Sequence, residues 1–276
     1  MFHFLKLFAA CSCVSLSFLF VDSVAFQSPR SWRTGTSRSN TQLGVSELHV
    51  PGYSQTKLPF IVSGEDFAPK SSYSSSDYDS LIPYQDGFLL HKTSGPIWTS
   101  SECDAIVQEA EDVASRVRWT TNRHGNFPTT DLPIVELPQT LSFLRQSLVE
   151  RIYPLLQSQF GSYLPEADRL RVADGFVVKY DAAGGQTELK PHRDGSVISF
   201  NIALNPSADF EGGGTWFASL NDAIKIEQGE IVSHASSLLH GGHGISAGKR
   251  YILVAFVIVE GYDNWSMRFY NQVRNH

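Results

Sequence analysis

The feature that most constrains this fold is a change of hydrophobic pattern near Arg171. From there the chain consists of short runs rich in β-branched and aromatic residues, separated by clusters of Gly, Pro, Asn and Asp. Runs of about four to eight such residues, bounded by turn formers, are typical of β-strands. The pattern predicts strands at Val172–Tyr180, Val197–Leu204, Gly214–Ser219, Ala223–Glu227, Ile231–His234 and Tyr251–Glu260.

Two segments before this region show helical periodicity. Ser100–Arg118 and Gln139–Phe160 carry apolar residues every three or four positions. Pro154 is expected to kink or divide the second helix, because proline has no amide hydrogen to donate. Helices followed by six strands predict a mainly β, α+β fold, with a double-stranded β-helix (jelly roll) core and the N-terminal helices packed outside.

The segment Trp119–Asp131 between the helices is polar and rich in turn-forming residues, with aromatic residues near both ends. It could border a substrate groove. It could equally be a surface loop, because loops are commonly polar for backbone reasons alone.

His192 and Asp194 stand two residues apart, and side chains at i and i+2 of extended backbone point to the same side. Alone the pair is weak, since a surface turn at Pro191 and Gly195 also explains it. A further histidine downstream would give two imidazoles and one carboxylate, which leave three metal positions open, as non-haem Fe(II) oxygenases require. A structural zinc site would instead be filled.

Arg250 supplies what a dicarboxylate cosubstrate needs, because a guanidinium can hold a carboxylate through two parallel hydrogen bonds. Three histidines lie between Asp194 and Arg250. His234 and His243 compete with His240 for the third ligand position.

Five motifs in order resemble the catalytic domain of the procollagen lysyl hydroxylases, which are Fe(II)- and 2-oxoglutarate-dependent dioxygenases, and more distantly the prolyl 4-hydroxylases. They are Phe176-Val-Val-Lys-Tyr180, Leu189-Lys-Pro-His-Arg-Asp194, Ser199-Phe-Asn-Ile-Ala-Leu-Asn205, Phe210-Glu-Gly-Gly-Gly-Thr215, and His240 followed ten residues later by Arg250. The resemblance runs from about residue 171 to residue 260. It is specific for the superfamily and not for the substrate.

The resemblance implies roles for individual residues. The catalytic iron ligands would be His192, Asp194 and His240, the last selected by its spacing from Arg250. The cosubstrate would be held by Arg250, Tyr180, Thr215 and Asn201. Tyr180 and Asn201 could instead be packing residues. Because related halogenases lack the carboxylate ligand, Asp194 favours hydroxylation.

The activity implied is hydroxylation of a C–H bond with O2, releasing succinate and CO2, with ascorbate restoring the iron. The substrate, protein or small molecule, is not implied, and the absence of further domains makes collagen an unexpected one. Two alternatives stay open: a small-molecule oxygenase or desaturase on the same scaffold, and a non-catalytic jelly-roll module that binds or senses a metal. A hydrolase has little support, since no Gly-x-Ser-x-Gly motif is present and Cys103 fits core packing.

The N-terminus predicts a two-part leader. Residues 1–25 have the basic start, apolar centre and small residues of a signal peptide, although a membrane anchor is an alternative. Residues 26–46 contain three Arg, many Ser and Thr, and no acidic residue, which is typical of a transit peptide. The pair resembles the leaders of algae with secondary plastids and implies plastid delivery. The alternative is the secretory pathway or ER lumen.

The remaining sequence predicts a linker or loosely packed extension at residues 47–83 and a dioxygenase domain at 84–276, with its core at about 171–260. The formal net charge of −6 gives no positive field to attract nucleic acid, so no nucleic-acid partner is expected. No stable membrane span is expected either.

Overall fold

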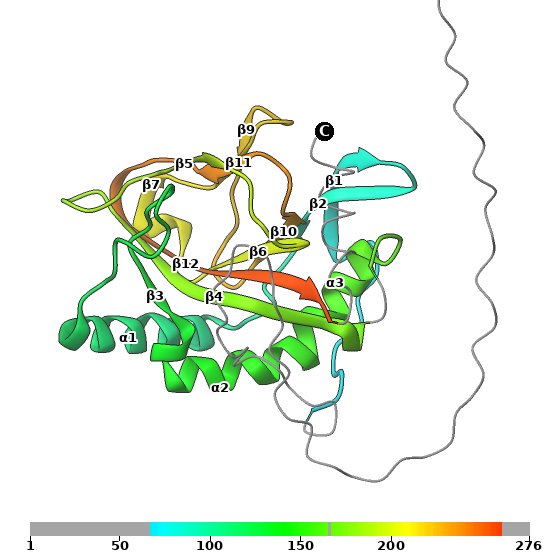
Figure 1. Ribbon diagram of the computed structural model, residues 1–276, viewed down its shortest axis with the longest axis horizontal. Helices are drawn as coiled ribbons and strands as arrows, with labels where there is room; N and C mark the ends of the chain where they lie inside the picture. Colours follow the sequence, from blue (N-terminus) through cyan, green and yellow to red (C-terminus); the bar gives the residue numbers. More distant parts are fainter. Residues whose placement is uncertain (1–66, 165–166, 261–276) are drawn as a thin grey trace, which may run out of the picture. The chain divides into compact units, whose positions relative to one another are not determined.

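The computed structural model describes residues 67–164 and 167–260 (Figure 1). The predicted leader and residues 47–66 of the predicted extension lie outside this range. Two antiparallel sheets form the centre: a larger one in the order β1-β2-β10-β6-β12-β4-β3, with β7 paired to β12, and a smaller one in the order β5-β11-β8-β9. The strands are β1 (Tyr78–Tyr84), β2 (Gly87–Thr93), β3 (Asp131–Pro133), β4 (Leu170–Asp181), β5 (Leu189–His192), β6 (Ile198–Ala203), β7 (Phe210–Gly212), β8 (Thr215–Phe217), β9 (Asp222–Ile224), β10 (Ile231–Ala235), β11 (His240–Gly242) and β12 (Ile245–Val259).

The chain passes back and forth between the two sheets. Strands β4, β6, β10 and β12 lie in the larger sheet, whereas β5, β8, β9 and β11 lie in the smaller one. This alternation is the arrangement of a double-stranded β-helix, and the sheets do not close into a barrel. The predicted fold class, mainly β with helices outside, is therefore confirmed.

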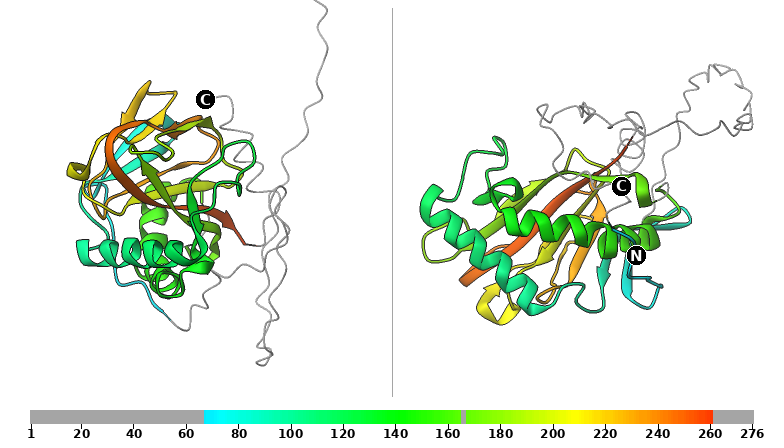
Figure 2. Two further views of the ribbon diagram at one scale, coloured as in Figure 1. Left: turned by 90° about the vertical axis from the view of Figure 1, so that its left-hand side faces the viewer. Right: turned by 90° about the horizontal axis from the view of Figure 1, so that it is seen from below.

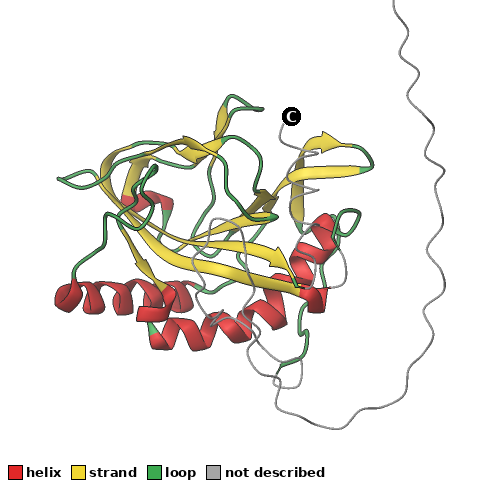
Figure 3. Cartoon of the chain, in the orientation of Figure 1, coloured by secondary structure: helices red, strands yellow, loops and turns green. Residues whose placement is uncertain are grey.

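The register of the larger sheet decides which residues face inward between the sheets. Tyr180 of β4 lies opposite Arg250 of β12, and Asn201 of β6 lies opposite Val254 of β12. Because side chains alternate along a strand, Leu253 points to the other face, where it is fully buried in the main core. The helices cover this other face, as seen from below in Figure 2 and in red in Figure 3.

Helix α1 (Ser100–Val117) begins with a capping box. The Thr99 hydroxyl accepts a hydrogen bond from the Glu102 amide at 3.2 Å, and the Glu102 carboxylate accepts one from the Thr99 amide at 2.7 Å. These bonds satisfy amides that the first turn leaves free. The buried face includes Cys103, which is fully inaccessible, so its predicted place in the core is confirmed.

The second predicted helix is divided, as the sequence indicates. Helix α2 (Pro138–Ser147) passes through a π-helical turn (Leu148–Ile152) into α3 (Tyr153–Phe160), with Pro154 in the first turn of α3. The proline cannot donate to a carbonyl of the preceding turn, which places the break just before it. Short 3-10 turns occur at Ile134–Glu136, Ala167–Arg169 and Ser207–Asp209. No helix among the residues described here is long and apolar enough to cross a membrane.

The structure differs from the sequence analysis at Tyr78–Tyr84. This segment, placed mostly in the loosely packed extension, forms strand β1 and pairs with β2 over its length. Tyr78 and Ile82 are buried, four positions apart, and Ile82 has a φ of 58°. The adjacent apolar residues Leu81 and Ile82 do not follow the two-residue alternation that identifies a strand in a sequence.

Candidate metal centre

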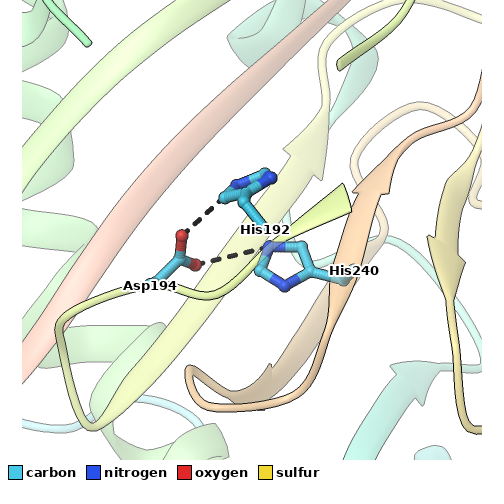
Figure 4. A group of neighbouring side chains, drawn as sticks. All are labelled: His192, Asp194 and His240. Carbon is cyan, nitrogen blue, oxygen red and sulfur yellow. Dashed lines mark ion pairs between the residues drawn. The ribbon is translucent and has the colours of Figure 1, made fainter. Parts of the chain in front are cut away.

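Three candidate ligands meet where the smaller sheet faces the larger one. His192 ends β5, Asp194 lies just after it, and His240 begins β11; β5 and β11 pair with His192 opposite His240. One donor atom of each residue lies within 4.8 Å of the others. His192 Nε2 is 3.4 Å from Asp194 Oδ1, and His240 Nε2 is 3.4 Å from Asp194 Oδ2 (Figure 4).

The backbone fixes which ring nitrogen of each histidine is free. His192 Nδ1 lies 2.9 Å from the Lys190 carbonyl oxygen, and His240 Nδ1 lies 2.9 Å from the Leu238 carbonyl oxygen. A carbonyl can only accept, so each Nδ1 carries the hydrogen and each Nε2 keeps a lone pair. Such outer bonds orient metal-binding histidines.

The charges of the triad also suit a cation. Burial alone would raise the pKa of Asp194, yet His240 and His192 hold that pKa well below its usual range. Burial opposes protonation of His192, but the interaction with Asp194 outweighs it and raises the pKa of His192. For His240 burial outweighs the interaction with Asp194, so the pKa of His240 is lowered. Asp194 is therefore ionised at neutral pH although only 6% exposed, and a buried carboxylate of this kind is a strong cation ligand.

All seven site residues predicted from the sequence line one cavity of about 210 Å³. They are His192, Asp194, His240, Arg250, Tyr180, Thr215 and Asn201. The rest of the wall is largely apolar, including Phe176, Val254 and Phe256.

Arg250 brings a buried positive charge to the wall of this cavity. Its side chain is 3% exposed, and its Nη1 makes no hydrogen bond to any described residue. Its guanidinium carbon lies 5.3 Å from the centre of the Tyr180 ring. Burial raises the pKa of Tyr180 against the opposing effect of Arg250, so the phenol stays protonated and can donate. A buried cation with a free donor fits an anionic ligand, because a buried charge left without a partner is costly.

Asn201 and Thr215 lie together in the wall between the two sheets. Both are 6% exposed, and Thr215 Oγ1 lies 3.5 Å from Asn201 Oδ1. Their polar groups line the cavity, so the structure places Asn201 at the site and not solely in packing.

The two competing histidines are not part of the ligand group. His243 is exposed just beyond β11 and is not among the residues that line the cavity. His234 lies within β10, with its ring 4.2 Å from that of His240 and its Nδ1 3.0 Å from the Ala235 carbonyl oxygen. It lines the cavity but is not part of the ligand group.

The loop before β3 also reaches the cavity. Its residues His124, Phe127 and Thr129 line the wall, and the Phe127 ring lies 5.0 Å from the His192 ring. Of the two alternatives for Trp119–Asp131, the structure agrees with a loop that borders a cavity.

Sequence reasoning missed several residues around the triad, among them Ser199, Ser236 and Arg193. Ser199 could have been found, because it stands two positions before the inward-facing Asn201 on the same strand. Nothing in the sequence pattern signals Ser236, which lies in the turn between β10 and β11 and meets Ser199 only through the fold.

Comparison with known proteins agrees with this geometry. The chain is 32% identical over 211 residues to human procollagen-lysine,2-oxoglutarate 5-dioxygenase 2, a match that covers 68% of this chain and 26% of that protein. It is 33% identical over 178 residues to the bovine procollagen-lysine,2-oxoglutarate 5-dioxygenase 1, covering 59% of this chain and 23% of that protein.

The chain resembles the procollagen lysyl hydroxylases. The similarity predicted from five motifs is thus confirmed. The chain spans about a quarter of the length of these relatives, and no family model matches it.

Among solved structures, similar ones include the viral collagen prolyl hydroxylase of Paramecium Bursaria Chlorella virus-1, with a TM-score of 0.45, 17% identity, and coverage of 62% of this chain and 97% of that one. Another is the α-ketoglutarate-dependent epimerase SnoN from nogalamycin biosynthesis, with a TM-score of 0.48, 15% identity, and coverage of 61% and 76%.

Proposed function

We propose that this protein is an Fe(II)- and 2-oxoglutarate-dependent dioxygenase that hydroxylates a C–H bond. One observation carries the proposal: a single cavity holds two histidines and a carboxylate with their donors converging, together with a buried arginine whose Nη1 has no hydrogen-bond partner among the described residues. The first group suits iron with open positions, and the second suits the far carboxylate of a dicarboxylate.

The donor set fits both groups. His192, Asp194 and His240 would hold the iron, while Arg250 and Tyr180 would hold the distal carboxylate of 2-oxoglutarate. Asn201 and Thr215 offer amide and hydroxyl groups along the wall. When bound, iron and 2-oxoglutarate together supply the activation of O2 that oxidation of a C–H bond requires.

The reaction balances as substrate C–H plus 2-oxoglutarate plus O2 giving substrate C–OH plus succinate plus CO2. The protein's own residues orient the bound groups and shield them from water. The Nδ1 bonds of His192 and His240 fix both rings, and Arg250 with Tyr180 fixes one end of the cosubstrate. The apolar wall of Phe176, Val254 and Phe256 limits water around the reacting atoms.

The test is succinate formation from 2-oxoglutarate in the presence of Fe(II) and O2, followed by the mass of any product. A gain of one oxygen supports hydroxylation, whereas loss of two hydrogens indicates a desaturase on the same scaffold. Succinate no higher than in a His240→Ala variant would contradict the proposal and favour a non-catalytic metal-binding module.

The use of ascorbate, the class of substrate and the cellular location are proposed from the sequence and not from the cavity. Ascorbate would restore the iron, as the resemblance implies, and the substrate is a protein or a small molecule. Delivery to a plastid is supported by the composition of residues 1–46, with the secretory pathway as the alternative. A fluorescent fusion of the full chain found outside the plastid would overturn that part.

A further inference from the structure

Three serines form a buried cluster behind the metal ligands. Ser196, Ser199 and Ser236 are 1%, 2% and 0% exposed. The Ser236 hydroxyl oxygen lies 2.8 Å from that of Ser199 and 2.6 Å from that of Ser196. They come from separate segments, with Ser199 on β6 and Ser236 in the turn that leads to His240.

The cluster ends on the carboxylate of Asp194. The Ser199 hydroxyl donates a hydrogen bond to Asp194 Oδ2. A carboxylate accepts only, so the Ser199 proton is committed to it, and Ser199 must accept from Ser236. The Ser196 hydroxyl donates to the Ile198 carbonyl at 3.2 Å and lies 2.6 Å from the Ser236 hydroxyl and 3.4 Å from that of Ser199. The three hydroxyls thus form one connected network that ends on Asp194, and the bonds of such networks strengthen one another.

The backbone ties the same segments together. The Asp194 amide donates to the Ser236 carbonyl at 2.8 Å, and the Ser236 amide donates to the Val197 carbonyl at 3.1 Å. The Arg193 guanidinium donates to the Ser237 carbonyl. The turn that carries His240 is therefore held against the segment that carries Asp194.

Packing alone does not account for hydroxyls at these places. Buried hydroxyls are unfavourable unless they are hydrogen-bonded, and alanine would fill nearly the same volume. The Ser199 hydroxyl bonds to Asp194 Oδ2, the oxygen that lies 3.4 Å from His240 Nε2, while Oδ1 lies 3.4 Å from His192 Nε2.

We infer that the serine cluster positions the carboxylate ligand, because the Ser199 hydroxyl holds Asp194 Oδ2 and so fixes the plane of the carboxylate between His192 and His240. A carboxylate held in one orientation keeps its oxygen atoms in place for a metal that the two histidines also bind. Ser199 is a positioning residue in this account. The inference rests on the proposed metal site.

The experiment uses Co(II) as the probe, added to the full chain under anaerobic conditions, and reads both the apparent Kd and the visible ligand-field spectrum. Ser199→Ala should raise the Kd by about 10- to 100-fold, the range found when outer partners of metal ligands are removed. Its ligand-field spectrum should change, because the Asp194 carboxylate is no longer held in one orientation. Ser199→Thr, which keeps the hydroxyl, should restore both readouts.

Ser233→Ala is the matched control. Ser233 lies on β10, is equally buried, and donates one side-chain bond, at 2.6 Å to Gln159, without touching Asp194. It should leave Kd and spectrum unchanged. If Ser199→Ala does not fold, Ser236→Ala provides the second variant, with a smaller rise in Kd of about 3- to 10-fold because Ser199 loses its donor.

The outcomes separate the two claims. Wild-type protein that fails to bind Co(II) contradicts the metal site itself. Wild-type binding with Ser199→Ala and Ser236→Ala indistinguishable from Ser233→Ala would overturn the positioning role and leave the metal site standing.

Discussion

Tyr180 and Arg250 lie directly opposite each other in the register of β4 and β12, with the guanidinium carbon 5.3 Å from the centre of the phenol ring. The pair lines the same cavity as the metal triad. A cation and a hydroxyl donor are thereby presented to the cavity without any acidic partner in the described part of the chain. This relationship makes the cosubstrate assignment testable separately from the metal.

Arg250→Lys should weaken 2-oxoglutarate binding by about 10-fold or more, because lysine keeps the charge but loses the two parallel donors of guanidinium. Metal affinity should change little, since Arg250 is not among the ligands. Titration calorimetry measures metal binding to the metal-free protein and 2-oxoglutarate binding to the metal-loaded protein. Arg116→Lys, an exposed change in α1, is the control. Equal 2-oxoglutarate affinity in the Arg250 variant would refute its role.

Asp194→Asn should reduce iron retention by about 100-fold or more, because the amide keeps the shape and removes the charge that a hard cation needs. Metal content after gel filtration measures the effect, and near-ultraviolet circular dichroism checks the fold. Asp222→Asn removes an exposed carboxylate on β9 and should leave metal content unchanged. Normal iron content in the Asp194→Asn variant would contradict the assignment of Asp194 as a ligand.

A buried histidine also lies outside the candidate metal centre, on β2. His91 of β2 is 1% exposed, with its ring 4.6 Å from that of Phe160 and its Nε2 without a partner among the described residues. Burial lowers the pKa of His91 from 6.5 to about 4. The unfolded chain therefore binds this proton at a higher pH than the folded one does.

His91 should make the fold sensitive to acid. Its contribution to stability is fully present above about pH 6.5 and should be lost as the pH falls toward 4, by up to roughly 3 kcal/mol. Urea unfolding measured from pH 8 to pH 4 should show this slope. In His91→Leu, which cannot be protonated, the slope over that window should be shallower. An identical slope in both proteins would show that His91 does not titrate with unfolding.

Gln186 fastens the loop that carries Phe127. Its Oε1 accepts from the Thr130 amide at 2.6 Å, and its Nε2 donates to the carbonyls of Pro128 and Glu188 at 2.9 and 2.8 Å. In Gln186→Ala the Thr130 amide should exchange hydrogen about 10-fold faster, because the loop opens more readily without these bonds. Gln108→Ala, on the exposed face of α1, is the control. Unchanged exchange at Thr130 would show that the loop is held by other contacts.

Much of the architecture could be predicted because β-branched runs mark the long strands. The predicted bounds of β4, β6 and β10 agree with the structure to within about two residues. Pro154 predicted the break between α2 and α3. Strands β5 and β11, which carry His192 and His240, have four and three residues and escaped prediction. Such short strands form because neighbours pair with them, not because of their own composition.

The candidate metal ligands could nevertheless be predicted, because they stand at fixed spacings: Asp194 is two positions after His192, and Arg250 is ten positions after His240. The residues that support the site from outside the ligand group do not stand at a fixed spacing. Ser236 reaches Ser199 across 37 positions, and Gln186 reaches Thr130 across 56. These contacts depend on strand register and loop packing, which no local pattern specifies.

The most direct measurement is anaerobic: add Fe(II) and then 2-oxoglutarate to the protein, and record the visible spectrum. The account predicts a charge-transfer band that requires both additions, is absent in His240→Ala, and in Arg250→Lys needs a higher 2-oxoglutarate concentration. Iron bound without any such band would contradict the proposed dioxygenase and identify the triad as a structural or sensory metal site.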